Sequence, residues 1–348
     1  MEEQSSLHRV TPKEGQKLLH KTAAYQRPGR WQSIWQLANT LVPYAVLWYL
    51  TYRAFTYSIW LALPAVVLLA GFVVRTFIIF HDCGHGSFFR SKKANDFWGR
   101  ITGLLTFTPF HRWRARHARH HGTSGNLDKR GEGDVWMMTV REYLQASRWE
   151  RLKYRLYRNP LVMFLMGPLL ITLVNNRIVG RKDSRADRRS VFGTNVALAL
   201  VVAGLLLVVG WQAFLFIVLG SLFLAHVAGV WLFYVQHQFE GMYWERSPRW
   251  DFVTAALKGG SFYKLPGILR WFSGSIGYHH LHHLNSRIPN YNLVRCQRKV
   301  GALTEAKPIG LISGLRSLKF RLWDEDSGRL ISFGDIRRRV NLPNAARS

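Results

Sequence analysis

Histidine is the residue type in this chain whose number and spacing could do chemistry. The 348 residues include 14 His, and most of these fall in four short places. We refer to HDCGH (81–85) as box one, HARHH (117–121) as box two and HHLHH (279–283) as box three, and a further His237 stands in FYVQHQ. On a helix, residues i, i+3 and i+4 share a face, so each HxxHH aims three imidazoles one way and HxxxH aims two.

This pattern predicts a metal site. Imidazole is the commonest neutral protein ligand, and it suits iron, copper, zinc and nickel. Clustered His could instead bind anionic lipid or sense pH when protonated. Gathered imidazolium ions would repel one another in a chain of formal net charge +28, whereas a metal takes neutral ligands and removes that cost.

Five histidines do not belong to the spaced HxxxH and HxxHH positions or to FYVQHQ. His226 stands alone in an apolar stretch and is interpreted as a hydrogen-bonded packing residue. His8 and His20, in the polar amino-terminal segment, are expected to be solvated. For His111 and His280 the choice stays open, and we favour partners of the ligands over ligands.

Three further side chains could act next to the boxes. Cys83 follows His81 by two positions, off the shared helix face, so a thiolate ligand is not expected. Asp82 and Asp134 are candidates for orienting an imidazole N–H. The alternative for these carboxylates is a salt bridge with a nearby Arg such as Arg119.

The elements that must position the boxes are strongly apolar. Segments 31–52, 54–74 and 190–239 contain no Asp, Glu, Lys or Arg. A bilayer crossing takes about 20 apolar residues, and the third segment is too long for one crossing. We therefore predict four transmembrane helices in two hairpins, at about 31–52, 54–74, 190–209 and 211–239, with the second turn near Gly210–Trp211.

The segment Asn159–Asn176 is less regular. It carries Pro160 and Pro168 and ends in two Asn. We interpret it as an interfacial or re-entrant piece, with a full span as the alternative.

Charge predicts the sidedness. The chain has 48 Lys and Arg against 20 Asp and Glu, and the basic residues flank the apolar segments. Four crossings put both termini and all boxes on one side, which the positive-inside rule makes cytoplasmic. Nucleic-acid binding is not expected, because no nucleic-acid motif accompanies this charge. Two Cys exclude a disulfide framework.

The sequence thus divides into three parts. Residues 1–30 are expected to form a basic cytoplasmic amino-terminal segment, 31–300 the membrane domain, and 301–348 a basic cytoplasmic tail.

The motifs HDCGH, HARHHGTSGN and HHLHHLNSRIPNYNL, in this order between two apolar hairpins, resemble those of the membrane fatty acid desaturases. Asp-Cys-Gly inside box one, and GDVWMMTVREY after box two, are closer to the acyl-lipid branch (Δ12, ω-3 and bacterial Δ5 types) than to the acyl-CoA Δ9 branch. The resemblance covers about residues 30–300. It implies an all-α integral membrane protein whose cytoplasmic helical cap holds a di-iron site. The implied iron ligands are His81, His85, His117, His120, His121, His237, His279, His282 and His283.

One position departs from the family pattern. The acyl-CoA branch has an Asn four residues before the histidine that His237 matches, and that Asn holds a metal through water. Here the position is Phe233, which puts the coordination of one iron and the role of His237 in question.

The resemblance implies an O₂-dependent desaturase that introduces a cis double bond into a fatty acyl chain, with a membrane lipid as the expected carrier of that chain. Two iron ions would activate O₂ for attack on an unactivated C–H bond. The chain has no haem motif, dinucleotide fingerprint or cysteine cluster, so the electrons must come from a separate ferredoxin, flavodoxin or cytochrome b5-like protein. The candidate lining residues of an acyl tunnel are Trp98, Trp113, Trp231 and Phe233, although we favour ordinary packing or the interfacial aromatic belt as the role of each.

Two other functions remain open from the sequence. A lipid hydroxylase or ketolase of the same histidine architecture would insert oxygen instead of leaving a double bond. A His-rich metal transporter would need carboxylates or His near mid-membrane, where the predicted spans hold only His226.

Overall fold

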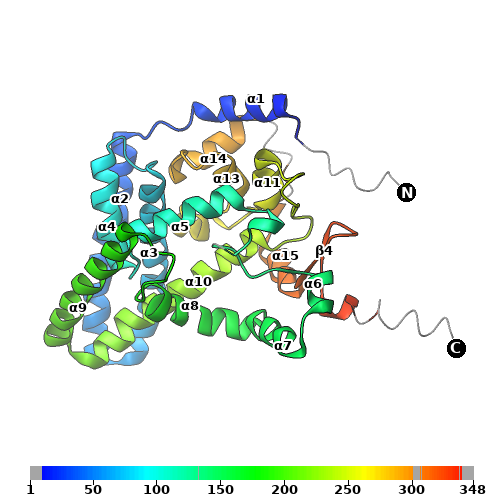
Figure 1. The fold of residues 1–348 in the computed structure, drawn as a ribbon. Coiled ribbons are helices and arrows are strands. Elements are labelled where there is room, and N and C mark those ends of the chain that lie inside the picture. The colour runs from blue at the N-terminus through cyan, green and yellow to red at the C-terminus, as the bar shows by residue number, and fades with distance from the viewer. Residues whose placement is uncertain (1–9, 132, 301–305, 307, 337, 339–348) are drawn as a thin grey trace.

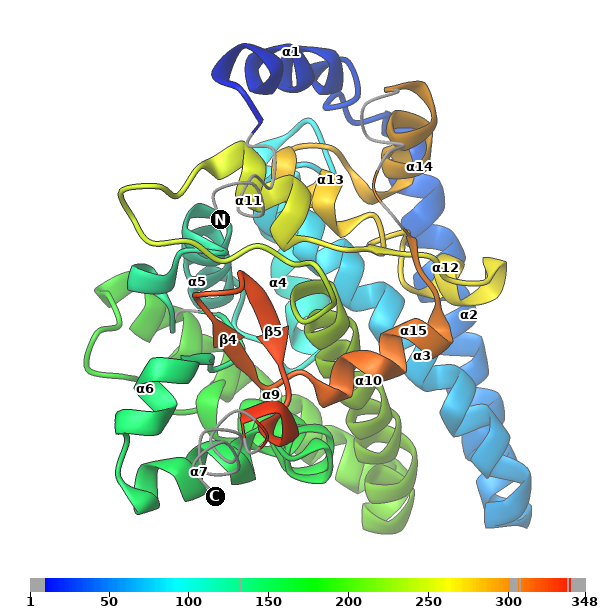
Figure 2. The ribbon, with the colours of Figure 1, turned by 90° about the vertical axis from the view of Figure 1, so that its right-hand side faces the viewer.

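The computed structural model of the chain describes residues 10–131, 133–300, 306, 308–336 and 338. The described part is mostly helical (Figure 1). Four long helices, α2, α3, α9 and α10, extend toward one end of the molecule, where α7 also lies, and the opposite end holds α11, α13 and α14 with α1 outermost (Figures 1 and 2).

The first predicted hairpin is formed by α2 (Arg30–Tyr57) and α3 (Ile59–His85), which pack against each other. They are separated by Ser58, whose backbone is extended and whose hydroxyl accepts a hydrogen bond from the Trp60 N–H at 3.3 Å. The turn therefore lies at Ser58 rather than at Arg53, because a single exposed charge does not break a helix while an extended capping serine does.

The second apolar segment folds as α9 (Arg185–Ala213), a π-helical piece η4 (Phe214–Leu219) and α10 (Gly220–His237). Gly210 breaks it with φ 79° and ψ 163°, a region open essentially to glycine alone. The predicted turn near Gly210–Trp211 is thus confirmed, and Figure 1 shows α9 and α10 meeting at the lower left.

By length and hydropathy, two stretches of the described residues could cross a membrane, Ile59–His85 and Arg185–His237. The second is 53 residues long, which at about 1.5 Å per residue exceeds twice the hydrocarbon thickness of a bilayer. Arg148–Tyr157 and Val162–Asn175, bent by 65°, together form a third stretch that is a broken span or a re-entrant loop. Both interpretations of the segment Asn159–Asn176 therefore stay open.

The remaining elements form the cap and its connections. The helical ones are α1 (Pro12–Ala23), α4 (Lys92–Leu105), α5 (Phe110–Thr123), η1 (Leu127–Lys129), α6 (Val140–Gln145), α7 (Arg148–Tyr157), η2 (Val162–Met166), α8 (Gly167–Leu170), η3 (Ile171–Asn175), α11 (Phe252–Gly259), α12 (Gly267–Phe272), α13 (His279–Leu284), α14 (Asn290–Lys299), α15 (Leu311–Arg316) and η6 (Ser317–Lys319). The strands are β1 (Met138–Thr139), β2 (Phe262–Tyr263), β3 (Pro308–Ile309), β4 (Leu322–Asp324) and β5 (Arg329–Ile331).

The segment expected to be a basic tail contains strands that pair with the body of the protein. β4 pairs in parallel with β1, Met138 opposite Leu322, and antiparallel with β5. β3 pairs in parallel with β2. Leu322 and Trp323 are buried, so burial of apolar side chains together with strand pairing fixes this segment to the cap. The residues after 338 lie outside the described part.

Gly210 provides a test of the second turn. Gly210→Ala should lower the free energy of unfolding by about 1–3 kcal/mol, because its positive φ is strained for any side chain while no atom lies near enough to clash. Gly204→Ala is the matched control, since Gly204 is helical and equally open, and alanine there should be neutral or stabilising. Thermal unfolding in detergent measures both, and equal effects would contradict the turn.

Candidate metal centre

Each box lies on a helix, and the helix ends bring the boxes together. His81 and His85 occupy the last turn of α3, which stops at Gly86 with φ 68°. His237 is the last residue of α10. Box two lies on α5, and box three starts α13. The ends of the two long apolar helices therefore meet two short cap helices, and the predicted convergence of the boxes is confirmed.

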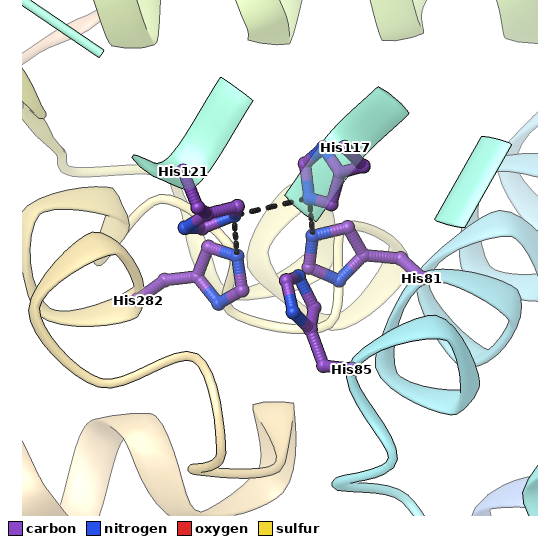
Figure 3. Close-up of side chains that lie close together, drawn as sticks. All are labelled: His81, His85, His117, His121 and His282. Carbon is purple, nitrogen blue, oxygen red and sulfur yellow. Dashed lines mark hydrogen bonds between the residues drawn. The ribbon is translucent and has the colours of Figure 1, made fainter. Parts of the chain in front are cut away.

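The nine histidines form two groups, and within each group one ring nitrogen per residue lies within 4.8 Å of all the others. The five-histidine group contains His81, His85, His117, His121 and His282 (Figure 3). The four-histidine group contains His120, His237, His279 and His283.

Boxes two and three are each divided between the groups. In box two, His117 and His121, one helical turn apart, belong to the five-histidine group, while His120 belongs to the other. In box three, His279 and His283 belong to the four-histidine group and His282 crosses to the other. All three imidazoles of each HxxHH thus face the candidate metal centre, as their shared helix face predicts, but they serve two groups rather than one. Residues i and i+4 stay together, while the remaining imidazole of each box reaches the neighbouring group.

The nitrogen spacings suit metal coordination. In the five-histidine group the Nε2–Nε2 distances are 3.0 Å for His81–His117, 3.1 Å for His117–His121 and 3.1 Å for His121–His282 (Figure 3). In the four-histidine group, Nε2 of His237 lies 3.2 Å from that of His120 and 2.8 Å from that of His279. Two nitrogens bound at right angles to one ion, each at about 2.1 Å, stand about 3 Å apart.

Unpartnered ring nitrogens supply an independent test of the fit. Nε2 of His85 and Nε2 of His283 are buried and have no hydrogen-bond partner among the described residues. Leaving a buried polar atom unsatisfied costs about 1–3 kcal/mol. Nδ1 of His121, His279 and His282 are also buried without a partner among the described residues, so each group holds more than one such atom. A cation in each group would satisfy Nε2 of His85 and Nε2 of His283.

The electrostatics favour the ligand form of imidazole. Burial lowers the pKa of His117 and His121 on α5 well below its usual value, and the neighbouring imidazoles lower it further. The same causes, in the same order, lower the pKa of His282 and His283 on α13. These rings stay neutral at physiological pH, as coordination requires.

Two carboxylates orient one histidine in each group. Nδ1 of His81 lies 3.1 Å from Asp82 Oδ1, and Nδ1 of His120 lies 3.0 Å from Asp134 Oδ1. A ring that donates from Nδ1 keeps its Nε2 lone pair for a metal. The prediction that Asp82 and Asp134 orient imidazoles is confirmed. Asp82 Oδ2 also accepts hydrogen bonds from the backbone N–H and side-chain amide of Asn290, at 2.7 and 2.9 Å.

The remaining histidines lie outside both groups. His111 contacts Arg100 and Arg114 through its two ring nitrogens, at 3.1 and 3.0 Å. His280 Nε2 lies 3.0 Å from Gln297 Oε1. The predicted packing role of His226 is confirmed, since its Nδ1 lies 2.8 Å from the Thr172 hydroxyl.

Three other predictions concern isolated residues. His20 is exposed, as expected, and His8 lies outside the described residues. Cys83 is buried in an apolar cluster with Leu37 and Ile79 and belongs to neither histidine group, as its position off the His81 face predicts.

The four aromatic residues considered for an acyl tunnel have different neighbours. Two of them lie against histidines of the two groups, and the other two pack elsewhere. The Trp113 ring stacks on His117 with centroids 4.3 Å apart, and the Phe233 ring lies 4.9 Å from that of His237. Trp98 packs against an apolar cluster below the site, and the Trp231 indole N–H lies 3.3 Å from the Tyr263 hydroxyl. Phe233 thus gives the four-histidine group an apolar wall where the acyl-CoA branch has an Asn.

Comparison with known proteins identifies the family. The model of the family described as "Fatty acid desaturase" matches residues 57–313, most of the chain. The chain belongs to the fatty acid desaturase family. It is 46% identical over 345 residues to a "Fatty acid desaturase" of Bacillus subtilis (strain 168), covering 99% of this chain and 96% of the relative.

More distant relatives carry narrower names. The chain is 29% identical over 255 residues to an "sn-1 acyl-lipid omega-3 desaturase (ferredoxin)" of a Synechocystis species, covering 69% of this chain and 68% of the relative. It is 26% identical over 247 residues to an "sn-1 oleoyl-lipid 12-desaturase" of Synechocystis, covering 70% and 69%. The desaturase is thus an oxidoreductase of lipid metabolism and a membrane protein, and the metal-transporter hypothesis finds no support.

Sequence reasoning missed the residues that hold the boxes in place. Asn290 supports Asp82, and Asn285, just after box three, contacts Thr22 on α1 and Gln26 in the segment that follows α1. Both asparagines lie in the segment NSRIPN that follows box three, but an Asn there is equally typical of a helix cap or a turn. Only the fold shows what they contact.

Asp134 provides a test of the carboxylate contacts. Asp134→Asn should weaken metal binding about 10- to 100-fold, because the amide is a poorer acceptor for the His120 N–H. Asp96→Asn is the control, since Asp96 pairs with Arg114 at a half-exposed site. Metal content by mass spectrometry after graded chelation gives the comparison. Equal retention by the two variants would contradict the role of Asp134.

Acid should destabilise the metal-free protein. The pKa of His117, His121 and His282 is lower in the folded state than in the unfolded chain. Above the unfolded pKa of about 6.5 these groups are neutral in both states, and the free energy of unfolding is at its full value. As the pH falls below that value, the unfolded chain binds more protons than the folded chain does, so the free energy of unfolding decreases. The melting temperature of chelator-treated protein, measured from pH 7.5 to pH 5, should therefore decline through this window. A flat profile would contradict neutral buried rings.

Proposed function

We propose that this desaturase is an O₂-dependent acyl-lipid enzyme that uses two iron ions to introduce a cis double bond. The observation that carries the proposal is the pair of histidine groups, five and four imidazoles, at the ends of α3 and α10. The proposed ligands are the nine histidines of those groups. Relatives that bear the names of ω-3 and Δ12 acyl-lipid desaturases support a lipid-linked substrate.

The donor set favours iron over zinc. Zinc sites in proteins are almost always four-coordinate and tetrahedral, and zinc has no redox chemistry. The five neutral imidazoles of one group exceed the four ligands of a tetrahedral zinc site. Distances near 3 Å between their Nε2 atoms favour ligands bound at right angles to one another. Iron accepts imidazole ligands, and two irons bound here would supply O₂ activation and removal of hydrogen from an alkyl chain.

The reaction balances with an external donor. One CH₂–CH₂ unit, O₂, two electrons and two protons give one CH=CH unit and two waters. This chain has no prosthetic-group motif of its own that could supply the electrons. A ferredoxin is the first candidate, because three relatives carry it in their names. A flavodoxin or a cytochrome b5-like protein would meet the same requirement.

The protein's own residues position the reaction. Asp82 and Asp134 hold the orientation of His81 and His120. Trp113 and Phe233 place apolar rings directly against the two groups, which limits water there. A long acyl chain is the substrate that such walls at the ends of apolar helices would accommodate.

The proposed topology has four crossings in two hairpins, with both termini and the metal centre in the cytoplasm. α2 is 28 residues long and packs along α3, although only α3 and the α9–α10 stretch are apolar enough to qualify by themselves. The basic residues flanking the spans support the orientation. The domain proposal keeps 1–30 and 31–300 as predicted, with 308–331 added to the cap by its strand pairing.

His282 tests the function. His282→Ala should abolish unsaturated product while the protein stays in the membrane, because one ligand of the five-histidine group is lost. His111→Asn is the control, since His111 lies on the same helix as box two but outside both groups. The measurement is gas chromatography with mass spectrometry of acyl chains from a host that lacks polyunsaturated lipids. Immunoblotting of the membrane fraction verifies expression.

Product mass separates the alternatives. Desaturation lowers the mass of the acyl chain by about 2 Da, whereas hydroxylation raises it by about 16 Da. A product at the higher mass would replace the desaturase proposal with a hydroxylase. Unsaturated product from His282→Ala would remove the metal centre from the mechanism.

A further inference from the structure

A surface cavity reaches both histidine groups from the side of α1. Its volume is about 270 Å³, and it is lined by one ligand candidate from each group, His121 and His283. The rest of its wall comes from α1, the segment after α1, Phe252 and the loop that follows box three, with Leu19, Gln26, Asn285 and Arg287 among the lining residues.

α1 is a fixed wall of this cavity. The Asn285 side chain donates to the Thr22 hydroxyl at 3.0 Å and accepts from the Gln26 amide at 2.9 Å. Thr22 and Asn285 are buried, and Leu18 belongs to the apolar cluster that α13 and α14 form. The amino-terminal segment is therefore tied to the loop after box three by buried polar and apolar contacts.

The surface around the cavity is strongly basic. The described residues of 10–30 and 286–300 include nine Lys and Arg, all exposed, and Glu14 as their single carboxylate. The basic residues are Lys13, Lys17, Lys21, Arg27, Arg30, Arg287, Arg295, Arg298 and Lys299. The two segments adjoin, since the Asn292 amide donates to the Tyr25 carbonyl at 3.0 Å. We refer to this surface as the α1–α14 face.

In the proposed topology, the α1–α14 face points away from the bilayer. Both ribbon views place α1 and α14 at the end of the molecule opposite the far ends of α2, α3 and α10 (Figures 1 and 2). Anionic lipid therefore does not account for this charge. A soluble partner of opposite charge does, because complementary potentials accelerate and orient encounter.

We infer that the α1–α14 face is the docking surface for an acidic one-electron carrier protein, with the cavity as its contact point beside His121 and His283. This inference rests on the proposed function and adds the place at which its electrons arrive. Each docking oxidises the carrier by one electron and reduces the metal centre by one. Two dockings, with two protons, complete the reduction of O₂ to water together with the hydrogens taken from the acyl chain.

A matched pair of charge reversals tests the inference. Lys17→Glu with Lys21→Glu reverses two exposed charges on α1, and Arg141→Glu with Arg148→Glu reverses two exposed charges on α6 and α7, far from α1 in both views. The probe is a reduced [2Fe–2S] ferredoxin of net negative charge. Its Kd for the detergent-solubilised desaturase is measured at low ionic strength and at about 0.3 M salt.

The α1 pair should raise the Kd about tenfold and weaken its salt dependence, while the α6–α7 pair should leave both near wild type. The ratio of ferredoxin-driven to dithionite-driven turnover should fall by a similar factor in the α1 pair. Lys17→Gln with Lys21→Gln removes the charges without placing Glu near the helix end, and it should give a smaller change in the same direction.

Several outcomes would overturn the inference. These are an unchanged Kd in the α1 pair, an equal or larger effect in the α6–α7 pair, or binding of an RNA oligonucleotide to this face in place of ferredoxin. Failure of the proposed function is distinguishable. A wild-type protein that binds ferredoxin through α1 but forms no unsaturated product with dithionite and O₂ would contradict the reaction while supporting the docking surface.

Discussion

The structure depends on keeping nine imidazoles buried, neutral and close together. Neutral rings at these spacings present several nitrogen lone pairs to the same small volumes, and five of the buried ring nitrogens, Nε2 of His85 and Nε2 of His283 among them, have no hydrogen-bond partner among the described residues. A cation in each group would take up the converging lone pairs and would satisfy Nε2 of His85 and Nε2 of His283. The surrounding protein supplies what the cation cannot, since Asp82 and Asp134 fix ring orientation and the helix ends fix position. Metal binding in these groups would therefore be coupled to folding, as is general for sites whose ligands are distant in sequence.

The sequence predicted the parts that depend on local spacing. The boxes fall on helices as their i, i+4 patterns require, and the turn at Gly210 follows from a charge-free stretch too long for one crossing. Convergence of the boxes was also predictable, because hairpins return the chain to the depth from which it left. The family followed from the same motifs, and the match over 57–313 confirms it.

The rest depended on contacts between distant segments. The division of box two between the groups is set by how α5 lies between α3 and α13, which no spacing encodes. The strand pairing of Met138 with Leu322 joins residues far apart in sequence through strands of two or three residues. Such strands are too short for an alternating pattern to show. The docking of α1 depends on the contacts of Asn285 with Thr22 and Gln26 and on the burial of Leu18 against α13 and α14, all between residues far apart in sequence.

The sharing of boxes two and three by both groups has a mechanical consequence. α5 contributes histidines to each group, and so does α13, so two bound ions would be held by the same two helices. The distance between the two ions would then be set by the geometry of the helices rather than by loops. A movement of either helix would displace both ions together. Filling one group would preorganise its neighbour, so assembly of the centre would be cooperative and half-filled molecules would be scarce.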